Sequence, residues 1–247
     1  LVDLLSKKLN ITETGREFLE YARHITATYH EMEQFLYHAS SQQCIHIGAS
    51  LTVGSFFLSD IITGYEAENP NVNIRVYIDN SMNIIRKISE GTLDVAVIEG
   101  NVKTKDVIFK DIFEDEMVLI CGKTHPFAGR SSINLTDLAG KAFVLREEGS
   151  GTREFLTDLT ENRGIPIVEK WICHSSDSII NIVASGQGVS ILSKSLLRHH
   201  DEVNQIAIND FPLKRSFKIV YHKDKFLSTG LRKLIAGIEN KFHSNTW

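Results

Sequence analysis

The chain has 247 residues and a formal net charge of −4, and 42% of its residues are apolar. This composition excludes a disordered chain, and the net negative charge excludes a protein that binds nucleic acid over its whole surface. No apolar run approaches the roughly 20 residues of a membrane helix and the first residues do not read as an export signal, which predicts a cytoplasmic protein without membrane contact.

The first predicted elements are a short strand within residues 1–13 and a long helix within residues 14–43. Thr12 or Thr14 is positioned to cap this helix, and Glu17 follows Thr14 in a capping-box arrangement. The apolar residues of the helix recur with alternating spacings of four and three, which is the pattern of a heptad seam. We expect the helix to pair with a second copy of itself; packing on its own domain is the alternative. The predicted seam consists of Phe18, Ala22, Ile25, Tyr29, Met32 and Leu36.

From residue 44 onward, predicted strands and helices alternate in two successive series. The first series has strands at 44–50, 73–78 and 94–98, helices at 52–68 and 82–90, and two further strands at 108–113 and 117–122. The second series has strands at 143–147, 168–175 and 189–192, with helices at 152–163 and 176–185. The predicted elements that follow are a helix at 194–200, strands at 202–208 and 216–223, and a helix at 229–242.

The two series have the same order of elements and nearly the same spacing. Gly91 follows the second helix of the first series, and Gly186 follows the second helix of the second series. Each is a βαβαβ unit, and parallel strands joined by helical crossovers form a sheet with helices on both faces. The predicted fold class is therefore α/β, with two Rossmann-like half-domains. Ligands of such sheets bind beyond the carboxyl ends of the strands.

Gly149-Ser150-Gly151-Thr152-Arg153 forms the predicted turn between a strand and a helix. Glycines allow the backbone to approach a ligand closely, and the free N–H groups of a helix start attract negative charge. The hydroxyls of Ser150 and Thr152 and the guanidinium of Arg153 are suited to the same ligand. The turn is therefore a candidate anion site; an ordinary helix cap with Thr152 as the capping residue is the alternative.

Small polar residues also follow the other predicted strands of both series. If the two halves face each other, these turns line a single cleft between them. The candidate effector-binding residues are Ser50, Leu51, Thr52, Asn80, Ser81, Glu99, Gly149, Ser150, Gly151, Thr152, Arg153, His174, Ser175 and Ser176. In such a cleft Glu99 would repel an anion; a solvated loop carboxylate is the alternative.

Several stretches of this pattern resemble the LysR-type transcriptional regulators. They are LNITETGREFLEYARHI, IGASLTVGSFFLSDIITGYEAENPNVNIRVYIDNS, GTLDVAVIEG and SSDSIINIVASGQGVSILSKS. The resemblance covers nearly the whole chain, and its motifs are specific in combination. The Gly-Ser-Gly-Thr-Arg turn resembles the branch with regulators of sulfur assimilation and carbon fixation, which points to an oxyanion or a phosphorylated metabolite.

The resemblance implies a fold similar to periplasmic binding proteins, with two half-domains joined by crossing strands and preceded by a linker helix. Residues 1–13 would be the end of a winged helix-turn-helix, and 14–43 the linker and dimerisation helix. Half-domain I would span 44–118 and 215–247, and half-domain II 119–214. The implied function is transcription regulation by a homodimer or homotetramer, which contacts DNA through an N-terminal domain and binds a small anionic metabolite or inorganic oxyanion.

Two other function classes are alternatives to regulation. A stand-alone anion-binding protein of the transport type shares the predicted cleft, but the heptad helix argues against it. An enzyme could use Ser50 or Ser150 as the nucleophile with His174 as the base, but the G-x-S-x-G elbow does not occur. The three cysteines and ten histidines show no metal-binding spacing. We therefore expect no catalysis, cofactor or metal.

Overall fold

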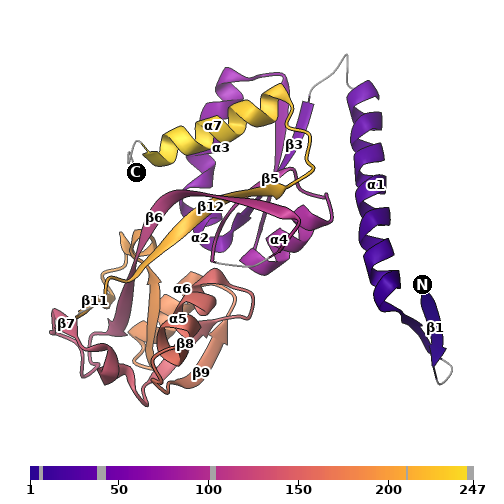
Figure 1. The fold of residues 1–247 in the computed structure, drawn as a ribbon. Helices are drawn as coiled ribbons and strands as arrows, with labels where there is room; N and C mark the ends of the chain where they lie inside the picture. Colours follow the sequence, from indigo (N-terminus) through magenta and orange to yellow (C-terminus); the bar gives the residue numbers. More distant parts are fainter. Residues whose placement is uncertain (6–7, 38–42, 101–103, 210, 244–247) are drawn as a thin grey trace.

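The computed structural model describes residues 1–5, 8–37, 43–100, 104–209 and 211–243. Two α/β lobes lie one above the other, and the long helix α1 (Glu13–Tyr37) lies beside the upper lobe (Figure 1). One continuous sheet of ten strands runs through both lobes. We call the upper lobe the first half and the lower lobe the second half. Their common sheet defines where side chains from the two halves can meet.

The first half contains the parallel strands β3 (Gln43–Ser50), β4 (Val72–Asp79) and β5 (Val95–Glu99). Its helices are α2 (Leu51–Phe56), α3 (Leu58–Glu68), α4 (Ser81–Ser89) and α7 (Thr229–His243). Apolar residues of α3 and α7 pack together in one core, and those of α4 belong to a separate core. The half is thus a three-layer sandwich whose sheet is covered on both faces.

The second half repeats this arrangement. Its parallel strands are β8 (Ala142–Arg146), β9 (Val168–Cys173) and β10 (Val189–Ser193). One core contains apolar residues of α5 (Gly151–Glu161), and another contains those of α6 (Ser176–Ala184). The carboxyl ends of its strands therefore carry the turns that begin α5 and α6.

Two antiparallel strands cross between the halves, β6 (Val107–Gly122) and β12 (Lys214–His222). The sequence predicted two strands, 108–113 and 117–122, where the structure has the single strand β6. The acidic residues Glu114–Glu116 do not interrupt it, because they pair in register with Lys214–Ser216 of β12. The N-terminal part of β6 belongs to the first half, and its C-terminal part pairs with β10 and β11 (Val203–Ile208) in the second.

The predicted helix 52–68 is divided into α2 and α3 at Phe57. Gly54 and Ser55, which are weak helix formers, precede the break. The ring of Phe57 is buried and contacts Phe113, Phe217 and Phe242 at centroid distances of 6.1, 5.4 and 5.4 Å. This aromatic cluster joins the break between two helices to both crossing strands and α7.

One further sequence prediction needs correction, and another lies outside the described residues. The predicted helix 194–200 is only a single 3-10 turn, Lys194–Leu197. A second 3-10 turn spans Leu135–Leu138, and a short strand β7 (Ser132–Ile133) pairs with β11. The end of the predicted linker segment, residues 38–42, lies outside the description, as does the side chain of Leu36. In the described part of the chain, no helix has the length and apolarity needed to cross a bilayer.

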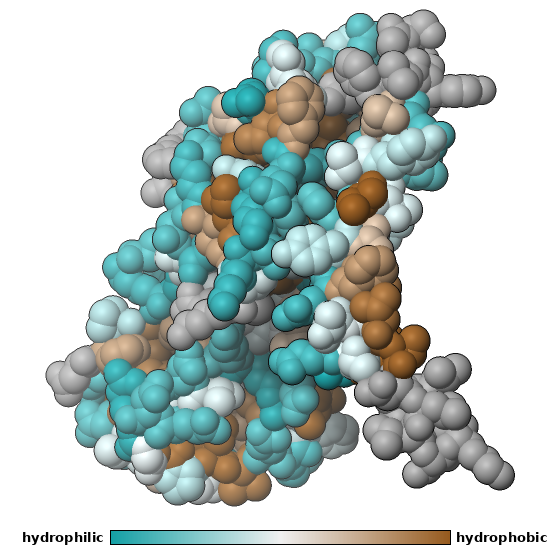
Figure 2. Space-filling model, turned by 45° about the vertical axis from the view of Figure 1, so that its right-hand side comes forward, coloured by the Kyte–Doolittle hydropathy of each residue, from teal (hydrophilic) through white to brown (hydrophobic). Residues whose placement is uncertain are grey.

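The N-terminal residues form a hairpin of β1 (Val2–Leu5) and β2 (Lys8–Ile11), and α1 follows. Thr12 is the capping residue, since its hydroxyl accepts a hydrogen bond from the Gly15 N–H at 3.0 Å. Along α1, the described seam residues with large side chains are exposed. Their exposed fractions are 56% for Phe18, 68% for Ile25, 55% for Tyr29 and 49% for Met32. Figure 2 shows apolar atoms along this helix.

Other residues of α1 contact the first half. Lys225, which follows β12, pairs with Asp94 at 2.6 Å and with Glu31 of α1. Arg23 lies 3.7 Å from Glu90, and Ala27 lies against Gly91. By helical spacing, Ala27 and Glu31 lie on the side opposite to the seam. The helix thus contacts the first half with one face and leaves the seam face uncovered.

The aromatic cluster gives a test of how the halves are built. Phe57→Ala removes a buried ring and leaves a cavity, so it should lower the free energy of unfolding by about 3–5 kcal/mol in urea denaturation. Phe226→Ala is the matched control, because this ring is 74% exposed and its loss should change stability by no more than about 0.5 kcal/mol. Equal effects of the two substitutions would contradict the assigned core.

Candidate functional site

The guanidinium of Arg215 connects the two halves. Its Nε donates to Asp115 of β6 at 2.7 Å. Its Nη1 donates to the hydroxyl of Thr152 at the start of α5, at 2.9 Å, and its Nη2 to the hydroxyl of Thr52 in α2, at 3.3 Å. All four residues are buried. One side chain from a crossing strand therefore bonds to the carboxyl-end turns of both halves.

Glu99 lies at the end of β5 beside this guanidinium and is 1% exposed. Its carboxylate accepts hydrogen bonds from the hydroxyls of Ser50 and Thr52, the latter at 3.2 Å. It lies 3.7 Å from Nη1 of Arg215. The hydroxyl of Ser81 donates to the Glu99 carbonyl at 2.7 Å. The hydroxyls predicted to bind an effector anion thus bind a carboxylate of the protein in this conformation.

Asp115 is the second buried carboxylate of the network. It accepts from the Ser193 hydroxyl at 2.7 Å as well as from Arg215. Burial raises the pKa of Asp115 above its ordinary value, although Arg215 and the Ser193 hydrogen bond act in the opposite direction. Two carboxylates share one guanidinium, so the network contains one more acidic group than basic groups.

The glycine-rich turn brings the second half against the first. Gly149 has a φ of 82°, a left-handed conformation that favours glycine, and its carbonyl accepts from the Met82 N–H at 3.1 Å. A Cβ at Gly151 would lie 2.5 Å from the Glu99 carbonyl oxygen, so only glycine fits this contact. Ser150, rather than Thr152, caps α5. Thr152 instead accepts the hydrogen bond from Arg215.

Arg153 and the predicted site residues around the start of α6 lie apart from this network. Arg153 donates to the Arg146 carbonyl at 3.2 Å and pairs with Glu169 of β9 at 2.8 Å, so its contacts stay within the second half. His174 is exposed, and Ser175 and Ser176 are partly exposed where α6 begins. Leu51 and Asn80 are partly buried at the starts of α2 and α4, and the Asn80 side chain caps α4. The Asn80 side chain also lies against Gly149 of the glycine turn. The structure therefore brings this turn together with the residues that begin α2 and α4 and with Glu99, and leaves Arg153, His174, Ser175 and Ser176 outside this group.

The arrangement does not support the serine nucleophile. The Ser50 hydroxyl donates to Glu99, and the Ser150 hydroxyl accepts from the Thr152 N–H at 3.3 Å. His174 is exposed on another strand end. Both serines are thus engaged with partners other than the histidine that catalysis would require.

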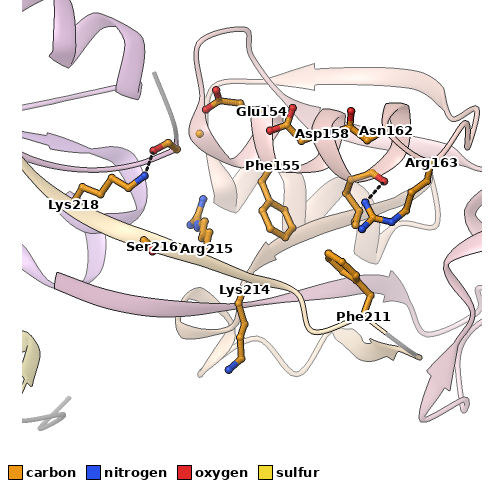
Figure 3. Close-up of a pocket in the computed structure, with 13 residues that line it drawn as sticks. Glu154, Phe155, Asp158, Asn162, Arg163, Phe211, Lys214, Arg215, Ser216 and Lys218 are labelled. Atoms are coloured by element: carbon orange, nitrogen blue, oxygen red, sulfur yellow. Dashed lines mark hydrogen bonds between the residues drawn. The ribbon is translucent and has the colours of Figure 1, made fainter. Parts of the chain in front are cut away.

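A cavity of about 360 Å³ opens beside Arg215, between α5 and β12 (Figure 3). Its volume lies at the lower end of the range for small-molecule sites. Phe155 and Phe211 extend into it from opposite sides, and Lys218 bonds to the Gly100 carbonyl at its edge (Figure 3). The lining residues are Gly100, Gly151, Glu154, Phe155, Asp158, Leu159, Asn162, Arg163, Phe211, Lys214, Arg215, Ser216 and Lys218. Both halves and a crossing strand contribute to this lining.

Residues 38–242 match the family model described as the LysR substrate binding domain. The chain belongs to the LysR-type transcriptional regulators. It is 29% identical to the HTH-type transcriptional regulator CysL of Bacillus subtilis, over 90% of this chain and 76% of that protein. It is 27% identical to the RuBisCO operon transcriptional regulator of Allochromatium vinosum, over 92% of this chain and 77% of that protein. These relatives are regulators, which does not favour a transport protein or an enzyme.

Among solved structures, the regulatory domain of Synechocystis CcmR in complex with 2-PG is similar to this LysR-type chain. The TM-score is 0.76 at 22% identity, and the match covers 83% of this chain and 99% of that one. The effector-binding domain of QuiR in complex with shikimate gives the same score at 18% identity, over 84% and 100% of the chains. The predicted fold, related to periplasmic binding proteins, is confirmed.

Arg215, Asp115 and Ser193 of this LysR-type regulator are not among the site residues predicted from the sequence. Arg215 and Ser193 lie next to predicted strands, and Asp115 lies in the acidic run between the predicted strands 108–113 and 117–122. Each crossing strand contains several charged residues, so one of them is a weak signal on its own. The structure supplies the decisive observation, because the three meet only through the antiparallel pairing of β6 with β10 and β12.

The central role of Arg215 can be measured as stability. Arg215→Leu leaves Asp115 and Glu99 buried without their cation, so we expect the free energy of unfolding to fall by about 3–5 kcal/mol. Arg153→Ala removes a guanidinium whose partner Glu169 is half exposed, and it should cost less than about 1 kcal/mol. Urea denaturation at neutral pH compares the two. An Arg215→Leu protein as stable as Arg153→Ala would show that the network does not hold the halves together.

Proposed function

We propose that this chain is the effector-sensing and oligomerisation part of a bacterial transcriptional regulator, and that its effector binds where the two halves meet. The observation that carries the proposal is the network around Arg215. It lies at the carboxyl ends of the strands, contacts both halves, and adjoins a cavity large enough for a small metabolite. A ligand that changes these bonds changes the relative position of the halves.

The proposed effector is a small anionic metabolite or an inorganic oxyanion. CcmR with 2-PG and QuiR with shikimate support a small-molecule ligand in this fold. The Arg215 guanidinium provides positive charge, and the hydroxyls of Ser50 and Thr52 provide donors that Glu99 now occupies. An entering anion would replace the Glu99 carboxylate on these hydroxyls. The proposed site therefore centres on Arg215, and the pairing of Arg153 with Glu169 argues against a direct role for Arg153.

The signal has a continuous route to α1. β12 begins beside Arg215 and ends at His222, and Lys225 beyond it pairs with Glu31 of α1. We infer that α1 is the linker helix, that residues 14–43 pair with a second copy along the seam, and that the assembly is a homodimer or homotetramer. DNA contact would come from a winged helix-turn-helix that ends near residue 13, in a cytoplasmic protein. The half-domain division at residues 44–118 with 215–247, and 119–214, belongs to the same proposal.

Effector binding can be tested by thermal unfolding with a panel of sulfate, sulfite, phosphate, phosphorylated sugars and hydroxylated carboxylates. A ligand at a hundredfold excess over its dissociation constant stabilises the folded state by about 2.7 kcal/mol, which gives a visible shift. Thr52→Val keeps the shape of the side chain and removes its hydroxyl, so the shift should be largely lost. Thr63→Val, on an exposed part of α3, should respond like the wild type. If Thr52→Val shows the same ligand-induced stabilisation as Thr63→Val, the ligand binds elsewhere.

The charge of the effector can be tested separately with Glu99→Gln. This substitution removes a negative charge from the site and retains most of the side-chain shape. It should tighten the binding of an anion by about tenfold or more, because a like charge no longer opposes it. Isothermal titration measures the change. Weaker binding of the hit to Glu99→Gln would show that the carboxylate is itself a ligand partner, and that the effector is not recognised as an anion.

Oligomerisation through the seam predicts a simple change of state. Ile25→Glu introduces a charge on the exposed apolar stripe, and light scattering should show a smaller assembly than for the wild type. Gln34→Glu adds the same charge on the other side of α1 and should leave the mass unchanged. The seam assignment fails if Ile25→Glu retains the wild-type mass.

A further inference from the structure

Two histidines and an aspartate meet between α1 and the first half. His24 lies in α1, His222 ends β12, and Asp224 follows two residues later. One potential ligand atom from each lies within 4.8 Å of the others. The two imidazole rings are stacked with their centroids 4.6 Å apart. Within the described residues, these three side chains are the group whose ligand atoms lie close enough together to hold one metal ion.

We propose that His24, His222 and Asp224 form a binding site for a divalent transition metal, with zinc as the preferred ion. The proposal does not depend on the identity of the effector, and it concerns the contact between the linker helix and the first half. Two imidazole nitrogens and one carboxylate oxygen are a donor set typical of zinc sites that keep a water molecule as the fourth ligand. Hard ions such as magnesium and calcium favour sites made wholly of oxygen atoms.

The local geometry indicates which atoms would bind. The Asp224 Oδ2 lies 3.9 Å from Nδ1 of His222, close to the roughly 3.3 Å that separates two ligands of a tetrahedral zinc ion. The same Nδ1 accepts a hydrogen bond from the Asp224 N–H at 3.2 Å, so its lone pair is directed toward this turn. A metal ion bound to Nδ1 would displace the Asp224 N–H as the partner of this nitrogen. The exposed Asp224 backbone would then be hydrated.

His24 supplies the third ligand by a small movement. Its ring is stacked at 29° to that of His222, and a nitrogen directed at a common ion requires rotation of this ring. His24 is only partly buried and Asp224 is exposed, so both side chains have space to rotate, whereas His222 is 7% exposed and fixed. The neighbouring Lys223 does not oppose a cation with its full charge, because it pairs with Asp106 at 2.6 Å.

Bound metal would act as a tether between α1 and the first half. The contact already contains Lys225 paired with Glu31 and Asp94, and the stacked histidines lie on the same side of α1. A metal–ligand bond from His24 adds a link that depends on an ion rather than on packing. It would stabilise the chain in proportion to metal occupancy.

The test is a Zn²⁺ titration of the chelator-treated full chain, with binding measured by isothermal titration calorimetry and the melting temperature by scanning calorimetry. The expected result is saturable binding of one ion per chain and a rise in melting temperature that EDTA reverses. His24→Ala and Asp224→Asn should each weaken binding by at least about tenfold. His30→Ala is the matched control, since His30 lies on the same helix, is exposed and is outside the cluster; it should bind like the wild type.

Three outcomes would overturn the proposal. They are the lack of saturable binding, wild-type affinity in both His24→Ala and Asp224→Asn, or an equal loss in His30→Ala. Circular dichroism of each variant checks its fold, and the two substituted positions were chosen because they are not deeply buried. A Co²⁺ titration provides an independent readout, because tetrahedral coordination by these ligands gives a visible absorption band that His24→Ala should remove.

Discussion

The relative position of the two halves depends on one buried guanidinium. A cation that is removed from water must keep its partners, because an unpaired buried charge costs several kcal/mol. Arg215 has Asp115, Thr52 and Thr152 as partners, which belong to a crossing strand and to both halves. The halves cannot separate here without exposing or replacing these bonds. In the proposed function, a small ligand acts at this network because a competing charge or hydroxyl changes which partners the guanidinium holds.

The carboxylate of Glu99 determines what such a ligand must do. It already occupies the hydroxyls of Ser50 and Thr52, where an effector anion was expected from sequence. In this conformation, a carboxylate of the protein itself accepts the hydrogen bonds of these hydroxyls. Exchange between an internal and an external anion gives the differential interaction that a two-state change requires. Glu99 lies beside Arg215 of β12, and Arg215 pairs with Asp115 of β6. A ligand that displaces Glu99 would therefore change the contacts of both crossing strands.

Strand β12 relates the two regions that carry the proposals. Its first residues contain Arg215, and its end contributes His222 to the contact with α1. β12 is hydrogen-bonded on both sides, to β5 and to β6, so it is an inner strand of the sheet. In the proposed signal route, a change at the junction of the halves reaches α1 through this paired strand and the ion pairs of Lys225. The metal site would lie at the far end of this route and determine how firmly α1 follows it.

The sequence by itself determined the α/β class, the two repeated halves, the capped helix α1 with its seam, and the polar turns of Ser50, Thr52 and the glycine motif. These follow from local periodicity, caps and glycine positions, which depend on near neighbours in the chain. Only the tertiary structure decided that β6 is a single strand, that Arg215 and Asp115 form the centre of a buried network, and that Arg153 pairs within its own half. It also brought His24 next to His222. These contacts join residues far apart in the chain, and the burial of a charge depends on what surrounds it in space, so residue spacing alone contains no record of them.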